Sequence, residues 1–472
     1  MNDIAETARA LRAGTCTAEQ LLRAAEQKID AREADHNAVI CQNPDAHAAA
    51  IAFDRHNQQD TPLAGIPILV KDNLDSGDAM PTTAGSLALA SGRASTDSAV
   101  VAKLRAAGAI LLGKTNLSEW ANFRSTRSSS GWSSAGGQTR NAHDPARTPG
   151  GSSSGSAVAV ALGYARAAIG TETDGSIVGP AAMNGVVGIK PTVGLVSQAG
   201  IIPISRSQDT AGPIARNVRD AATVLSAIAT RAGTPDYAAG LEASTLRGAR
   251  LGVARNYTGI HDGVDVVFEA ALAELSAAGA IIVDELEAPH GEALRADERF
   301  VMETEFRVGL REYLATRDAD VSVRTLEDLI EFNARHEQDV LKYFGQELLI
   351  ASQQRGELDS SVYRRAVARC RYTTRADGID RLLRDHNLDA LIAPTQTVPW
   401  LIDWHGGDNR RQSFSMPAAI AGYPHVTVPM GMVEHLPVGL SFVAGAWQEQ
   451  CVINFAHAFE QRNPKRVTDL TE

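Results

Sequence analysis

Apolar positions recur at helical spacing through the first 60 residues of the chain. Thr17 and Gln20 form the signature of a helix N-terminal capping box, and Leu22 and Ile29 then repeat along one face. A helix with one apolar face buries that face against a neighbouring element. This spacing predicts that residues 1–60 are helical.

The pattern changes between residues 65 and 215, where short apolar runs alternate with segments rich in Gly, Ser, Thr and Pro. Helix-like stretches occur at 97–107, with Asp97 as the N-cap, and at 154–162. Alternating strands and helices favour an α/β sheet with helices on both faces. Four runs have the length and composition of buried strands, namely residues 65–70, 109–112, 165–169 and 186–189.

After residue 215 the chain again alternates between strand and helix patterns. No linker is long enough or rich enough in Pro and Gly to demand a second domain. We therefore expect one domain over residues 1–472. The segments concerned are a strand–helix–strand pattern at 249–286, a charged helical region at 290–385 with a long periodic stretch at 326–349, and strand-like runs at 390–393 and 425–430.

Composition disfavours several classes of protein. The formal net charge is −11 and no basic stripe is visible, which disfavours a nucleic-acid or anionic-membrane partner. No run of 18 apolar residues and no export signal occur. The four cysteines are widely spaced, as expected for reduced thiols rather than disulfides. We expect a cytoplasmic protein with no nucleic-acid and no membrane partner.

Residues 108–115 match the phosphate-binding pattern G-x-x-x-x-G-K-[ST]. In a phosphate loop the four central residues form an open loop whose N–H groups surround the anion. Here these residues are Ala-Ile-Leu-Leu, which are typical of a buried strand. The histidines show no metal-ligand spacing either. We therefore expect no nucleotide, no metal and no cofactor.

Residues 151–155 match G-x-S-x-G, which would make Ser153 the nucleophile of an α/β-hydrolase. Such a nucleophile follows directly after a buried strand. The preceding residues 140–149 are polar and contain prolines. We therefore interpret this match as accidental.

Two loops of small residues, 149–156 and 170–177, lie on either side of a helix–strand unit. Loops in this arrangement can meet at one end of a sheet, and their glycines let backbone N–H groups approach a ligand. From composition alone a pair of ordinary turns remains open. Three lysines end apolar runs and become neutral bases if buried, or are simply lysines at strand ends. They are Lys71, Lys114 and Lys190.

An ordered set of segments resembles the amidase signature family. The resemblance extends from about residue 15 to 460 and is densest over 65–215. It implies the amidase signature fold, a single large α/β domain with a mixed, mostly parallel twisted sheet covered by helices on both faces. It also implies a signature core at about 65–215 and a helical insertion at about 290–385. The segments that carry the resemblance are 65–73, 113–116, 150–153, 170–176 and 188–194.

The resemblance implies a Ser-Ser-Lys catalytic set. Ser176 is then the nucleophile that forms an acyl-enzyme, Ser152 relays its proton, and Lys71 is the base. The two serines are 24 positions apart, close to the family interval, and this selects Ser152 over Ser153. The family pattern also implies a cis peptide bond between Gly151 and Ser152.

The resemblance further implies which groups surround the substrate. The expected oxyanion donors are the backbone N–H groups of Thr173, Asp174, Gly175 and Ser176. The residues that align with the family's substrate-side loop are Thr126, Ser128 and Ser129. Asp174 and Trp132 are further candidates for the pocket wall, with a helix cap and core packing as their respective alternatives.

Within the family, the chain is similar to the bacterial peptide amidases. Most other members have two glycines before the nucleophile and an arginine two residues after it, where this chain has Asp174 and Val178. The segments that resemble the subgroup are 116–123, 128–134 and 171–178.

The resemblance implies a hydrolase that converts a C-terminal peptide amide, or a similar small amide, to an acid and ammonia. We expect it to act without a cofactor, as a monomer or homodimer. One alternative is an amidase of a different small aryl or aliphatic amide. Another is the amidase subunit of a tRNA-dependent amidotransferase. A silent binding protein is disfavoured because Lys71, Ser152 and Ser176 are all present.

Overall fold

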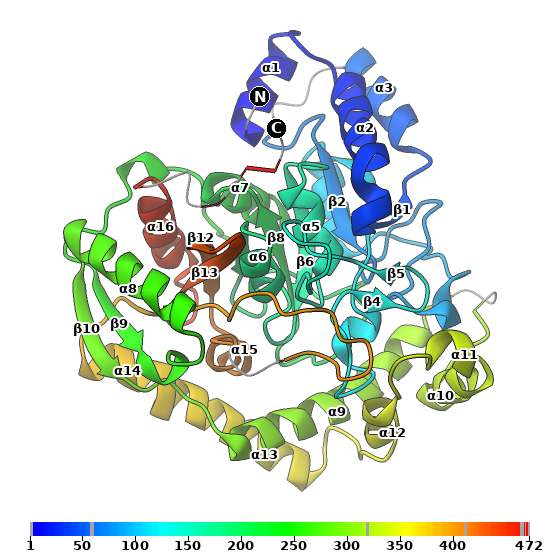
Figure 1. Ribbon diagram of the computed structural model, residues 1–472. Helices are drawn as coiled ribbons and strands as arrows, with labels where there is room; N and C mark the ends of the chain where they lie inside the picture. Colours follow the sequence, from blue (N-terminus) through cyan, green and yellow to red (C-terminus); the bar gives the residue numbers. More distant parts are fainter. Residues whose placement is uncertain are drawn as a thin grey trace.

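The computed structural model describes residues 3–56, 61–317, 321–409, 413–462, 467 and 469–470. Within these residues an eleven-stranded sheet runs through the molecule in the order β1-β3-β2-β6-β8-β7-β12-β13-β11-β9-β10 (Figure 1). Its strands are β1 (Val39–Gln42), β2 (Pro67–Lys71), β3 (Ile110–Thr115), β6 (Ala167–Glu172), β7 (Val187–Lys190), β8 (Thr210–Ala215), β9 (Arg250–Ala254), β10 (Ile281–Leu286), β11 (Ala390–Pro394), β12 (His425–Val433) and β13 (Leu436–Val443). A two-stranded sheet pairs β4 (Trp132–Ser133) with β5 (Gly137–Gln138).

Helices cover the sheet and extend beyond it. The helices before residue 230 are α1 (Ile4–Arg12), α2 (Ala18–His36), α3 (Ala46–His56), α4 (Ala99–Ala106), α5 (Ser154–Ala161), α6 (Val178–Met183) and α7 (Val218–Ile228). Those after it are α8 (Asp262–Ala277), α9 (Glu292–Leu314), α10 (Leu326–Arg335), α11 (Glu337–Val340), α12 (Glu347–Gln353), α13 (Ser361–Thr374), α14 (Asp380–Asp385), α15 (Met416–Ala421) and α16 (Glu449–Glu460). Helices α9 to α14 lie together along the lower part of Figure 1.

Side chains alternate between the two faces of the sheet, as the period of a strand requires. Along β11, Ala390 and Ile392 belong to the apolar cluster that also contains residues of α7, α8 and α16. Their neighbours Leu391 and Ala393 pack in another cluster, with residues of α14 and α15. The sheet is therefore buried on both faces, as the sequence predicts.

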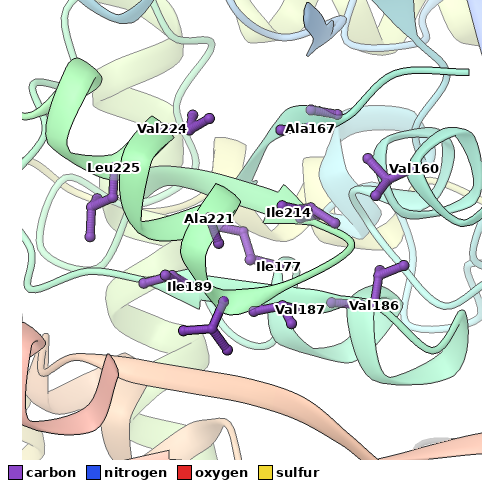
Figure 2. Packing of buried hydrophobic residues seen from close by; sticks show 14 of the residues in the cluster. Val160, Ala167, Ile177, Val186, Val187, Ile189, Ile214, Ala221, Val224 and Leu225 are labelled. Atoms are coloured by element: carbon purple, nitrogen blue, oxygen red, sulfur yellow. The ribbon is translucent and has the colours of Figure 1, made fainter. Parts of the chain in front are cut away.

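The largest apolar cluster includes the contact between α7 and the centre of the sheet. Figure 2 shows Ala221 and Leu225 of α7 near Ile214 of β8 and Ile189 of β7. All four side chains are fully buried. Burying a Leu or Ile side chain contributes roughly 1.5–3 kcal/mol, so contacts of this kind hold the central strands in place.

The sheet is mixed, as expected, and contains more antiparallel pairs than the sequence indicated. Strands β3, β2 and β6 pair in parallel, as do β11, β9 and β10. Strand β8 lies antiparallel between β6 and β7, and the β12–β13 hairpin adds further antiparallel pairs. Single-strand patterns indicate burial but not the direction of a neighbour, which explains the difference.

The prediction that residues 1–60 are all helical is wrong, because residues 39–42 form strand β1, which pairs with β3 at the edge of the sheet. The short run Val39-Ile40-Cys41 is apolar and begins with two β-branched residues, which suits a strand. Residues 1–2 and 57–60 of this prediction lie outside the described residues.

The other predicted elements are present, with shifted ends. The capping box at Thr17 is confirmed, and each predicted strand run overlaps a strand of the sheet. Asp97 is not the N-cap of α4. Ser98 caps it by accepting a hydrogen bond from the Val101 N–H, while Asp97 accepts one from the Gly77 N–H.

The periodic stretch at 326–349 is not one helix. It contains α10, α11 and the start of α12, because the backbone leaves the helical region at His336 and turns again after Leu341. The division into a signature core and a helical insertion stays a prediction. In the part of the chain that the structure describes, no helix has both the length and the apolar character needed to cross a membrane.

Candidate active site

The carboxyl ends of β2 and β6 bring together the first groups of the site. The two strands are parallel neighbours, with Val70 opposite Ile169, so the residues that follow lie at the same edge of the sheet. Lys71 ends β2 and its side chain is fully buried. Its Nζ lies 2.7 Å from Ser152 Oγ, and 2.8 Å and 3.3 Å from Thr171 Oγ1 and O.

Burial governs the charge of this amine. Removal from water disfavours the ammonium form and lowers the pKa of Lys71 to about 7, although the carboxyls of Asp209 and Glu172 act in the opposite direction. Neither carboxyl forms an ion pair with Lys71 among the described contacts. Asp209 instead accepts hydrogen bonds from the N–H groups of Ile204 and Ser205, and burial raises the pKa of Asp209 to about 7. With a pKa of about 7, the Lys71 amine is largely uncharged at a pH slightly above 7.

The loop that carries Ser152 is attached to β6 through its neighbour, Ser153. Ser153 Oγ donates to Thr171 O at 3.0 Å and accepts from Thr171 N at 3.1 Å. The hydroxyl of Ser153 is therefore occupied by the backbone of a strand, and no strand of the described residues immediately precedes it. The peptide bond between Gly151 and Ser152 is cis, as expected.

Gly151 allows the loop to approach its neighbours closely. A Cβ on this residue would lie 2.4 Å from Ser118 Oγ and 2.7 Å from Ser130 Oγ, which is closer than real Cβ atoms come. Any larger residue would have to displace these two serine side chains, whose hydroxyls bond to the Gly131 N–H and to the Asp408 carboxylate. Glycine is the only residue that fits without such a shift.

Ser176 lies on the loop that leaves β6. Its carbonyl accepts the Ser153 N–H at 3.1 Å, so the two serine-bearing loops predicted to meet are in contact. The Glu172 carboxylate accepts the N–H groups of Ile177 and Val178 at 2.8 Å and 3.1 Å, at the start of α6. Glu172 thus provides the capping role that had been an alternative for Asp174.

Ser176 opens into a cavity of about 360 Å³. The four residues expected to donate to an oxyanion, Thr173 to Ser176, all line it. Sequence reasoning missed many of the other lining groups, since no motif marks them. They include Glu298, Arg295, Arg299 and Met302 of α9, and Gln396, Trp400, Asp408 and Ser415 from the segment after β11.

The predicted substrate-side loop is only partly at the cavity. Thr126 lines it, and the carboxylate of Glu347 holds this residue by accepting from its N–H at 2.6 Å and its hydroxyl at 2.7 Å. Ser128 and Ser129 are 2% and 3% exposed and are not among the lining residues. Trp132 is buried and packs against Arg124 and Phe344, in line with its core alternative.

The other two buried lysines have different partners. Lys114 Nζ donates to Leu74 O and Thr82 Oγ1, and lies 3.9 Å from Asp72 Oδ1. Lys190 donates to Pro191 O, and burial lowers its pKa to about 8. None of the three lysines lines the cavity, and Lys71 is the one whose amine contacts Ser152. The phosphate-loop match ends in a strand, as predicted.

Comparison with known proteins defines the class of this chain as a serine-dependent amidase, a hydrolase of amide bonds. The family model for amidases matches residues 20–453, and the chain belongs to the amidase family.

Solved structures of peptide amidases are similar over the whole chain. The native peptide amidase from Stenotrophomonas maltophilia is 46% identical, with a TM-score of 0.92, covering 99% of this chain and 98% of that one. A peptide amidase in complex with the competitive inhibitor chymostatin is 47% identical, with a TM-score of 0.93 and the same coverage.

Curated relatives include a probable amidase and an amidotransferase subunit. A probable amidase from Arabidopsis thaliana is 37% identical, covering 90% of this chain and 83% of the relative. A glutamyl-tRNA(Gln) amidotransferase subunit from Chloroflexus aurantiacus is 36% identical, covering 96% of this chain and 94% of the relative.

We predict that Lys114→Ala destabilises the protein more than Lys71→Ala. Removing Lys114 leaves the buried Asp72 carboxyl without its neighbouring cation, a loss that typically costs about 3–5 kcal/mol. Removing a neutral amine at Lys71 strands no opposite charge. Urea unfolding of both variants measures the difference, with the exposed Lys103→Ala as control. Equal destabilisation by Lys114→Ala and Lys71→Ala would contradict the view that Lys114 balances a buried carboxylate whereas Lys71 is neutral.

Proposed function

We propose that this protein hydrolyses C-terminal peptide amides through an acyl-enzyme on Ser176, with Ser152 as the proton relay and Lys71 as the base. The observation that carries the proposal is the 2.7 Å contact between the fully buried Lys71 amine and Ser152. A neutral lysine has a lone pair, which an ammonium lacks. Its two N–H groups have the two oxygens of Thr171 as acceptors, which leaves the lone pair for the Ser152 O–H.

The proposed first half-reaction moves one proton along a row of three groups, from Ser176 through Ser152 to Lys71. As Ser176 Oγ attacks the amide carbonyl carbon, its proton passes to Ser152 Oγ and the Ser152 proton passes to Lys71 Nζ. The carbonyl oxygen becomes an oxyanion, for which the N–H groups of residues 173–176 are the proposed donors. When the C–N bond breaks, the proton returns through Ser152 to the nitrogen, and ammonia leaves.

The second half-reaction uses the same groups with water in place of the amide. Water gives a proton to Ser152 as its oxygen attacks the ester carbonyl, and the row again holds that proton on Lys71. The ester C–O bond then breaks and the proton returns to Ser176 Oγ. The acid is released and the row is restored, so no cofactor is consumed.

Two features support a peptide amide as the substrate. The solved structures described above include peptide amidases, one of them with a bound inhibitor, at 46–47% identity. The cavity, at about 360 Å³, is of the size that holds a small ligand, and it combines apolar walls such as Met302 and Trp400 with polar ones such as Gln396. The acyl side of the substrate would lie against these walls. The expected cytoplasmic location, monomer or homodimer state, and lack of nucleic-acid and membrane partners remain predictions.

The first alternative is an amidase of another small aryl or aliphatic amide, and the second is an amidotransferase subunit, of which a curated relative is 36% identical. We predict that the isolated chain releases ammonia from acetylated dipeptide amides much faster than from free glutamine. A peptide amidase needs no partner, whereas an amidotransferase subunit would act on glutamine within its complex. A coupled ammonia assay measures both rates, and aryl and aliphatic amides complete the series. Turnover of glutamine, with none of any peptide amide, would contradict the proposal.

We predict that a fluorophosphonate adds mass to the peptide that contains Ser176 and to none that contains Ser153. Ser176→Ala should abolish labelling. Ser152→Ala should slow it strongly, since losing general-base assistance typically costs a factor of about 100 or more. Ser415→Ala is a matched control because Ser415 lines the same cavity without a proposed chemical role. Peptide mass mapping that located the adduct on Ser153 would refute the assignment.

A further inference from the structure

A second hollow adjoins the active-site cavity on the far side of one loop. This groove, of about 700 Å³, is lined mostly by residues of the segment 397–409. In Figure 1 this segment belongs to the orange stretch that crosses the middle of the view, between β11 and α15. Trp400, which belongs to this segment, lines both the groove and the active-site cavity. A single loop therefore separates the groove from the site of Ser176.

The other end of this loop, residues 407–409, also lies between the cavity and the groove. Asp408 lines the active-site cavity, whereas its neighbours Gly407 and Asn409 line the groove. The loop is held there from the cavity side, since the Ser130 N–H and hydroxyl donate to the Asp408 carboxylate at 2.9 Å and 2.6 Å. Gly407 packs so closely on the Arg127 backbone that a Cβ would lie 2.5 Å from its carbonyl oxygen.

Backbone hydrogen bonds hold the first part of the segment 397–409, around Trp400. The Thr148 N–H donates to Trp400 O at 2.8 Å, and the Ile402 N–H donates to Ala146 O at 3.0 Å. Residue 148 is four positions before Ser152, so the strip that supports the groove continues directly into the proposed relay loop. The segment between the groove and the cavity is therefore attached by backbone hydrogen bonds to residues 146 and 148.

The groove presents apolar side chains to solvent. Leu401 is 61% exposed and Ile260 is 45% exposed, and both line it together with Val398. Arg147 is occupied by the Asp144 carboxylate and by Pro399 O. Large aliphatic side chains exposed in one groove favour an apolar group that covers them, and the groove also has polar residues such as His261 and Asp403.

We propose that this groove binds the upstream residues of peptide amides too long for the active-site cavity, with an apolar side chain seated against Leu401 and Ile260. The inference rests on the proposed function. The carbonyl attacked by Ser176 fixes one end of such a peptide, and each residue of an extended chain adds about 3.3–3.6 Å. The peptide must leave the cavity, and Trp400 is the residue that lines both the cavity and the groove with the exposed Leu401 and Ile260.

The test compares acetylated peptide amides of two to six apolar residues. In the wild type, kcat/KM should rise with length until the groove is filled. Leu401→Asp should cost the longest peptide roughly tenfold, the scale of one lost aliphatic contact, and leave the dipeptide amide unchanged. Val266→Asp is the control, because Val266 is 70% exposed on α8 and does not line the groove.

Three results would overturn the inference. One is a kcat/KM that is independent of length in the wild type, and another is an equal loss for short and long peptides in Leu401→Asp. The third is a wild-type dimer in sedimentation that Leu401→Asp makes monomeric, since the groove would then bind a second copy. Hydrolysis of aryl amides with none of any peptide amide would instead defeat the proposed function itself.

Discussion

The whole arrangement depends on keeping one amine out of water. Lysine is a cation at neutral pH unless burial removes the solvation of its charge, and a cation cannot accept a proton. Lys71 meets this condition because β2 lies inside the sheet, between β3 and β6. Its surroundings offer hydroxyls and a carbonyl rather than a carboxylate in contact. A carboxylate in contact with the amine would favour the ammonium form and so remove the proposed base.

The fold supplies the remaining groups around this buried amine. Parallel pairing of β2 and β6 places Thr171 beside Lys71, and the loop after β6 then carries Ser176. Ser153 uses both its hydroxyl and its N–H to join the two loops. The cavity wall comes from elsewhere, from α9 and the segment after β11. One part of the chain thus determines the proposed chemistry, and distant parts determine what reaches it.

This division explains which features could be predicted from the sequence. Buried strands could be predicted because their apolar runs are local. Lys71 and Ser176 could be proposed only from the resemblance to the amidase signature family, because the residues alone left Lys114, Lys190 and a pair of ordinary turns open. Glu298 and Trp400 could not, since they lie on a charged helix and an irregular loop whose positions depend on tertiary packing. Ser128 and Ser129 belong to a motif, yet the turn that contains them directs both into the interior. Sequence patterns identify burial and loop type, but not which buried residue faces a cavity.

The most direct test of this account is the pKa of Lys71 itself, measured by NMR titration of the labelled lysine side chains. Using Ser176→Ala prevents turnover, and with only seven lysines in the chain the Lys71 signal can be assigned by its loss in Lys71→Ala. The account predicts a pKa of about 7, so that the amine is protonated at pH 6, largely neutral at pH 8, and the base is lost as pH falls through this value. A pKa near the ordinary value of about 10.4 would contradict it, because Lys71 would then be a cation throughout the neutral range.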